Sequence, residues 1–143
     1  MTAIANIFDG ALSEEAVAES LAAPIWRAGR EGAQTGALVR FDGIVRRMEP
    51  DATGEGRPLA ALDYRTYDPM AERELAALAR RTLGEHGLLR IAALHSRGRV
   101  DVGATSFILI VEAAQRKDAL AAMTAFIEAL KRDVPIWKHP VWA

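Results

Sequence analysis

Cysteine is absent from this chain, and its absence removes several kinds of chemistry at once. Without a thiol the chain has no disulfide, no thiolate-bound metal and no cysteine nucleophile. The three histidines, His86, His95 and His139, lack the close spacing typical of metal ligands, so we expect no metal site and no bound cofactor. Any sulfur chemistry would therefore need sulfur that is brought from outside.

The chain also lacks an excess of positive or negative charge. The formal net charge of the 143 residues is -1, which provides no positive field for a nucleic acid or an anionic membrane. No apolar run approaches the roughly 20 residues that a membrane span needs, and the first residues lack the regions of a signal peptide. Glycine-rich phosphate-binding motifs are absent too. We expect a cytoplasmic protein that binds neither nucleic acid nor membrane.

The hydrophobic content, half of the residues, suffices for one core. We expect a single domain over residues 1–143, in which residues 1–35 form a peripheral N-terminal segment. This segment should contain a short helix at about 14–23, because Ser13 can cap it and Pro24 can end it.

The rest of the chain alternates between strand and helix patterns. Apolar residues with a period of two, or in one continuous run, predict strands at about 36–46, 59–67, 88–95 and 105–111. The last of these is apolar enough to be buried on both faces at the centre of a sheet. Helical stripes of apolar residues follow Asp68 and Asp118, and each aspartate is the expected N-cap.

The segments between these elements complete the predicted fold. Residues 47–58 are polar and rich in Gly and Pro, which predicts an exposed, mobile loop. Residues 97–99 predict a turn, and residues 135–139 a short extended piece. The order, β-β-α-β-β-α-β after a short helix, predicts an α+β fold with helices packed on an antiparallel or mixed sheet.

The end of the chain carries the strongest sign of chemistry. Lys131 ends the last helix, and Lys138 follows a proline break next to Trp137. A lysine at a helix C-terminus is stabilised by the macrodipole, so a purely structural role for Lys131 stays open. Trp137 should surround the Lys138 ammonium with apolar surface. If both lysines face one cavity, one could bind an anion while the other transfers protons or attacks a carbonyl.

Two arginines and a histidine also lie at the ends of predicted elements. Arg46 follows a strand, and Arg116 precedes a helix whose first N–H groups are available for a phosphate. The alternative for both is a solvated surface arginine. His95, at a strand end, is either a structural histidine or a base.

The order and spacing of several motifs are more specific than any motif alone. They are Gly36–Ala37, Phe41-x-Gly43-x-Val45–Arg46, Leu62-x-Tyr64-x-x-Tyr67-x-x-Met70–Ala71, His95 with Gly98-x-Val100-x-Val102–Gly103, Arg116, Leu130–Lys131 and Pro135–Ile136–Trp137–Lys138. With these motifs, the chain resembles the large, catalytic subunit of molybdopterin synthase from about Gly36 to Lys138.

This resemblance implies an α/β-hammerhead fold and a homodimer within a heterotetramer. Each large subunit would take up the C-terminal Gly-Gly tail of a small ubiquitin-like sulfur carrier. The carrier's terminal thiocarboxylate would supply sulfur to cyclic pyranopterin monophosphate, which becomes the dithiolene of molybdopterin in molybdenum cofactor biosynthesis. Sulfur that arrives on a partner also fits a chain without cysteine.

The resemblance also implies roles for individual residues. Lys131 and Lys138 become the catalytic pair. Both lysines also become substrate contacts, together with Ile44, Val45, Arg46, Gln115, Arg116 and His139. Where the family usually has Ser-x-His-Arg, this chain has Ala113–Ala114–Gln115–Arg116, and its tail after Lys138 is short. Two alternatives remain: a ferredoxin-like regulatory module that binds a small ligand, and an inactive paralogue that only docks the carrier.

Overall fold

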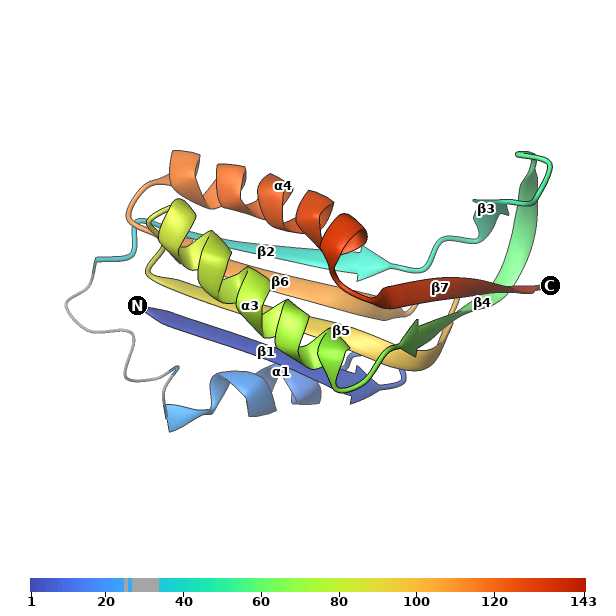
Figure 1. The fold of residues 1–143 in the computed structure, drawn as a ribbon, viewed down its shortest axis with the longest axis horizontal. Helices are drawn as coiled ribbons and strands as arrows, with labels where there is room; N and C mark the ends of the chain where they lie inside the picture. The colour runs from blue at the N-terminus through green and yellow to red at the C-terminus, as the bar shows by residue number, and fades with distance from the viewer. Residues whose placement is uncertain (25, 27–33) are drawn as a thin grey trace.

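The computed structural model describes residues 1–24, 26 and 34–143, and its strands form one seven-stranded sheet (Figure 1). The named elements are β1 (Thr2–Asp9), α1 (Glu14–Leu21), β2 (Ala37–Ile44), β3 (Met48–Pro50), β4 (Gly56–Thr66), α3 (Met70–Glu85), β5 (Arg90–Asp101), β6 (Thr105–Ala113), α4 (Arg116–Asp133) and β7 (Ile136–Trp142). The strand order is β2-β6-β5-β4-β3, with β1 paired to β5 and β7 paired to β4. Only the β1–β5 pair is parallel among these described pairs, so the predicted α+β fold with a mixed sheet is confirmed.

The middle strands of the sheet are buried on both faces. Ile91 and Leu109 belong to the main core under α3 and α4, whereas their neighbours Ala92 and Ile108 belong to a second core with α1. Figure 1 shows α3 and α4 side by side across the same face of the sheet. Successive side chains of a strand point to opposite faces, which explains why β6 reads as one continuous apolar run. The prediction that this strand is buried on both faces is confirmed.

The N-terminal segment contains a strand that was not predicted, because residues 2–9 form β1, which pairs in parallel with β5. The predicted helix is present as α1, and the Ser13 side chain accepts a hydrogen bond from the Ala16 N–H at 3.1 Å. Residues 25 and 27–33 of the predicted peripheral segment lie outside the described residues. The sequence pattern did not predict β1 within this segment.

Two further predictions about loops were wrong. Within the predicted loop at residues 47–58, β3 pairs with the start of β4 to make a hairpin. Residues 97–99, predicted as a turn, continue β5 out to Asp101. Both segments are too polar and too rich in Gly or Pro for strand propensity to show. In the structure, pairing with β4 compensates for that weak propensity.

The predicted aspartate caps are also replaced by other interactions. The Asp68 carboxylate accepts hydrogen bonds from Thr66 Oγ1 at 2.8 Å and from Arg97 Nη1 at 2.7 Å, and Pro69 occupies the N-cap position of α3. Asp118 lies in the first turn of α4, whose N-cap, Gln115, comes three residues earlier than predicted. The Arg97 guanidinium also binds Asp9 at 2.9 Å, so this ion-pair cluster joins β1, β5 and the start of α3.

Candidate active site

A pocket of about 770 Å³ opens where α4 ends and β7 begins. Its walls come from β2 and the segment after it, β3, β4, β5, β6, α4 and β7. The lining residues are Phe41, Asp42, Gly43, Ile44, Val45, Arg46, Glu49, Leu62, Tyr64, His95, Ser106, Phe107, Ile127, Leu130, Lys131, Ile136, Trp137 and Lys138.

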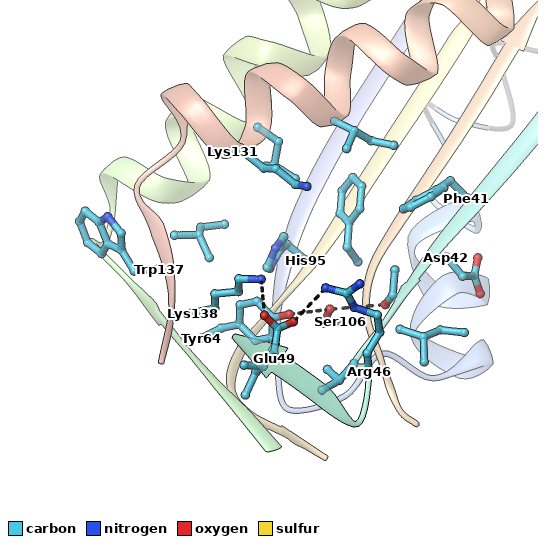
Figure 2. Close-up of a pocket in the computed structure, with 18 residues that line it drawn as sticks. Phe41, Asp42, Arg46, Glu49, Tyr64, His95, Ser106, Lys131, Trp137 and Lys138 are labelled. Atoms are coloured by element: carbon cyan, nitrogen blue, oxygen red, sulfur yellow. Dashed lines mark hydrogen bonds and ion pairs between the residues drawn. The ribbon is translucent and has the colours of Figure 1, made fainter. Parts of the chain in front are cut away.

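Three cationic side chains reach this pocket from three different parts of the fold (Figure 2). Lys131 comes from the last turn of α4, Lys138 from β7, and Arg46 from the segment after β2. Figure 2 shows the lysine side chains directed from α4 and β7 toward the same space. The two lysines therefore share one cavity, as the sequence-based hypothesis required.

Backbone hydrogen bonds fix the segment that carries Arg46. The Val45 N–H donates to the Ala104 carbonyl at 3.0 Å, and the Gly103 N–H donates to the Val45 carbonyl at 2.9 Å. Gly103 has a φ of 86°, a left-handed conformation that glycine adopts without strain. The β5–β6 turn can therefore direct the Gly103 N–H and the Ala104 carbonyl toward Val45. The β5–β6 turn therefore holds the segment after β2, and with it Arg46, in place beside the pocket.

Glu49 lies between two of the cations. Its Oε1 is 3.4 Å from Arg46 Nη2, and its Oε2 is 3.6 Å from Lys138 Nζ. The side chain of Glu49 is only 12% exposed, compared with 74% for Arg46 and 56% for Lys138. A carboxylate held from β3 thus bridges the two cations at the mouth of the pocket.

The inner wall carries a neutral polar group of three side chains. The Tyr64 hydroxyl donates to Ser106 Oγ at 3.0 Å, and its ring meets His95 edge-on at 5.1 Å between centroids. His95 Nδ1 lies 2.7 Å from the Ser96 carbonyl, which can only accept, so this nitrogen carries the proton. Burial lowers the pKa of His95 and raises the pKa of Tyr64. Both groups are therefore neutral near pH 7, and His95 Nε2 is available as an acceptor.

The other predicted contact residues divide into two groups. Ile44 and Val45 line the pocket, whereas Gln115, Arg116 and His139 do not. Gln115 is the N-cap of α4 and Arg116 its first residue, at the opposite end of the helix from Lys131, roughly 22 Å away at 1.5 Å per residue. His139 directly follows Lys138 in β7, so its side chain points to the other face.

The expected role of Trp137 was wrong. Its side chain is 55% exposed, and Figure 2 shows its indole on the other side of β7 from the Lys138 ammonium. Neighbouring residues of a strand face opposite ways, so, although Trp137 lines the edge of the pocket, its indole does not cover that ammonium. The Lys138 ammonium instead faces the Glu49 carboxylate.

Sequence reasoning missed Glu49, Tyr64 and Ser106 as pocket residues. Tyr64 was visible only as part of a motif. Glu49 was hidden in the polar segment after β2, and no local pattern distinguishes it from its exposed neighbours. Only the hairpin that β3 forms with β4 directs this carboxylate to the pocket.

Across residues 1–24, 26 and 34–143, no group of three His, Asp or Glu side chains is arranged to hold a metal ion. None of the helices in the same described part has the length and apolar character needed to cross a membrane.

Comparison with known proteins identifies the family. The family model described as "MoaE protein" matches residues 13–133, which is most of the chain. This chain belongs to the MoaE family. A rice (Oryza sativa subsp. indica) protein named molybdopterin synthase catalytic subunit is 37% identical over 107 residues, 75% of this chain and 53% of that protein. The chain thus spans about half the length of the curated relatives that it matches.

Solved structures of MoaE-type proteins share the fold. Molybdopterin synthase from Staphylococcus aureus superposes with a TM-score of 0.73 at 28% identity, covering 96% of this chain and 90% of that one. A complex of subunits 1 and 2 of molybdopterin-converting factor from Helicobacter pylori gives a TM-score of 0.69 at 23% identity, covering 97% and 89%. Membership of the MoaE family argues against the alternative of a ferredoxin-like regulatory module.

Proposed function

We propose that this chain is the catalytic subunit of a molybdopterin synthase. It would transfer sulfur from the C-terminal thiocarboxylate of a small ubiquitin-like carrier to cyclic pyranopterin monophosphate, and so form the dithiolene of molybdopterin. The observation that carries the proposal is the convergence of Lys131, Lys138 and Arg46 on one pocket. Both reactants are anionic, and a pocket with three cations suits them.

The cations can be given separate tasks. Arg46 offers a planar fork of N–H donors that suits an anion with two acceptor atoms, such as the terminal group of the carrier tail or the phosphate of the pterin. Lys131 and Lys138 are compact donors that can polarise the carbonyl of the thiocarboxylate and move protons on the pterin intermediate. When sulfur leaves the carrier, water must replace it, and the carrier departs with an ordinary carboxylate.

The neutral inner wall supports the pterin rather than the sulfur chemistry. Tyr64 and His95 present polar atoms beside the ring of Phe107. A flat heterocycle needs such a combination of ring contact and hydrogen-bonding groups. We assign the pterin to this wall, and the carrier tail to the mouth formed by Arg46 and Lys138.

Gln115 and Arg116 fit the proposal only if a second copy takes part. Within one chain they lie at the far end of α4 from the pocket. The family resemblance implies a homodimer within a heterotetramer, and in such a dimer these two residues would serve the pocket of the partner copy.

The test supplies the purified chain with a thiocarboxylated carrier and cyclic pyranopterin monophosphate. We expect dithiolene to form, and we expect none when the carrier ends in an ordinary carboxylate. No product with the thiocarboxylated carrier, despite formation of a complex, would contradict the proposal. That result would favour an inactive chain that only docks the carrier.

Gln115, which stands where the family usually has histidine, allows a direct test of the alternative that the chain is inactive and only docks the carrier. Glutamine can hydrogen-bond but does not titrate near neutral pH, unlike the histidine usual at this place. If the native chain is inactive and Gln115→His makes it active, the docking role is supported. If the native chain already forms dithiolene, the inactive alternative fails.

A further inference from the structure

Glu49 occupies an unusual place for an acidic residue in a pocket that should bind anions. Each of its two carboxylate oxygens faces a different cation, Arg46 on one side and Lys138 on the other. A carboxylate or thiocarboxylate at the end of a peptide has the same two-oxygen or oxygen-and-sulfur geometry. A tail whose terminal group bound both cations would therefore need the position that Glu49 occupies.

The other acidic residue of the pocket does not compete for these cations. Asp42 is bound by Arg40, whose Nε donates to Asp42 Oδ1 at 2.8 Å and whose Nη2 donates to Oδ2 at 3.1 Å. Among the described lining residues, only Glu49 pairs with Arg46 or Lys138. The Glu49 carboxylate is thus the negative charge that an incoming anion would have to displace from Arg46 and Lys138.

The element that carries Glu49 is suited to small movements. β3 has three residues and pairs only with the beginning of β4 within the described sheet. The two ion pairs are also loose, at 3.4 and 3.6 Å, and their cations are mostly exposed. The Glu49 side chain is only 12% exposed, but pairs at these distances with exposed cations are weak, so another carboxylate can replace Glu49 at the two cations.

We propose that Glu49 is an internal competitor for the anion site formed by Arg46 and Lys138. Its carboxylate gives way when an anionic tail binds and returns when the tail leaves, which limits how tightly a tail ending in a carboxylate is held. This inference rests on the proposed function for the identity of the tail. Two sulfurs are needed for each dithiolene, so a spent carrier must leave before the next one enters.

The test measures the binding of a peptide ending in Gly-Gly to the full chain by calorimetry at low salt. The peptide is used with a free C-terminal carboxylate and, as a neutral control, with a C-terminal amide. We expect Glu49→Gln to tighten binding of the carboxylate peptide about fivefold, and to change binding of the amide less than about twofold. Glu55→Gln, an exposed position on the same hairpin outside the pocket, should leave both affinities unchanged.

Two outcomes would overturn the inference. Equal or weaker binding of the carboxylate peptide by Glu49→Gln would show that Glu49 positions the cations instead of competing for them. The second outcome is tighter binding of the carboxylate peptide that persists when Glu49→Gln is combined with Lys138→Gln. It would show that Glu49 does not act at the anion site formed with Lys138. Dithiolene formation by the native chain is measured separately, so either result can overturn this inference while the proposed function stands.

Discussion

His95 shows how burial sets the chemistry of a single side chain in the pocket. It is 6% exposed, its Nδ1 donates to a backbone carbonyl, and burial lowers its pKa below the ordinary value of 6.5. A charged imidazole beside Lys131 and Lys138 would add a further positive charge to an already cationic pocket. The neutral form leaves Nε2 as an acceptor for an N–H of a heterocyclic ligand.

The lowered pKa predicts how stability depends on pH. Below about pH 6.5 the unfolded chain protonates this imidazole more readily than the folded chain, so the free energy of unfolding falls as pH drops. The loss is at most about 1.4 kcal/mol per pH unit. Urea unfolding at pH 7.5 and 5.5 should show a larger loss for the native chain than for His95→Gln. Equal losses would contradict the assignment.

A second residue-scale prediction concerns the ion pair between Arg90 and Glu112, which face each other across β5 and β6. Their side chains are 5% and 0% exposed, and the Arg90 guanidinium also lies 4.1 Å from the Trp26 ring and donates to the Trp26 carbonyl at 2.7 Å. Arg90→Ala would leave a buried carboxylate without this partner and should cost about 3–5 kcal/mol in urea unfolding.

The matched control for that variant is Arg99→Ala. Arg99 is 57% exposed and pairs with an exposed aspartate, so its loss should cost less than about 1 kcal/mol. Similar losses for the two variants would show that burial of the Arg90 pair does not matter.

At the scale of elements, the sequence predicts what local pattern controls. The apolar run of β6 and the Ser13 cap were found because burial and capping leave a mark on neighbouring residues. β3 and the outer half of β5 were missed, because their formation depends on pairing with β4 and not on their own composition. β1 was missed for a related reason, since its residues are only partly buried and it joins the sheet through a parallel pairing with distant β5.

Two glycines give a prediction about how elements meet. A Cβ on Gly36 would lie 2.1 Å from the Ala114 carbonyl oxygen, so Gly36→Ala must push β2 away from the end of β6. Gly84 lies in α3 with nothing within 4 Å of such a Cβ. In thermal unfolding, Gly36→Ala should be less stable than the native chain, while Gly84→Ala should gain about 0.5–1 kcal/mol. An unchanged stability of Gly36→Ala would contradict this close approach of Gly36 to the Ala114 carbonyl.

At the scale of the whole molecule, the pocket was only partly predictable. Lys131 and Lys138 are close in sequence, and one turn between α4 and β7 brings them together. Arg46 is distant in sequence, and only the pairing of β2 within the sheet brings it close to the two lysines. Gln115 and Arg116 share α4 with Lys131 but lie at its other end, which no motif reveals. Glu49 depends on a hairpin that the sequence pattern does not show.

The proposed dimer makes a prediction about mixed subunits. If Arg116 serves the pocket of the partner copy, Arg116→Ala and Lys138→Ala are each inactive alone. When the two variants are mixed and allowed to exchange subunits, about a quarter of the sites regain both groups and activity returns. If activity does not return, although subunit exchange is verified, Arg116 does not act across a dimer.

The central claim is that Lys131 and Lys138 work together on an incoming thiocarboxylate, and single-turnover formation of dithiolene tests it most directly. Lys131→Ala and Lys138→Ala should each slow the reaction by about a hundredfold or more, as expected for loss of a group that assists proton transfer. Arg80→Ala, an exposed position of α3 outside the pocket, should react at the native rate. Native rates from both Lys131→Ala and Lys138→Ala would contradict the account.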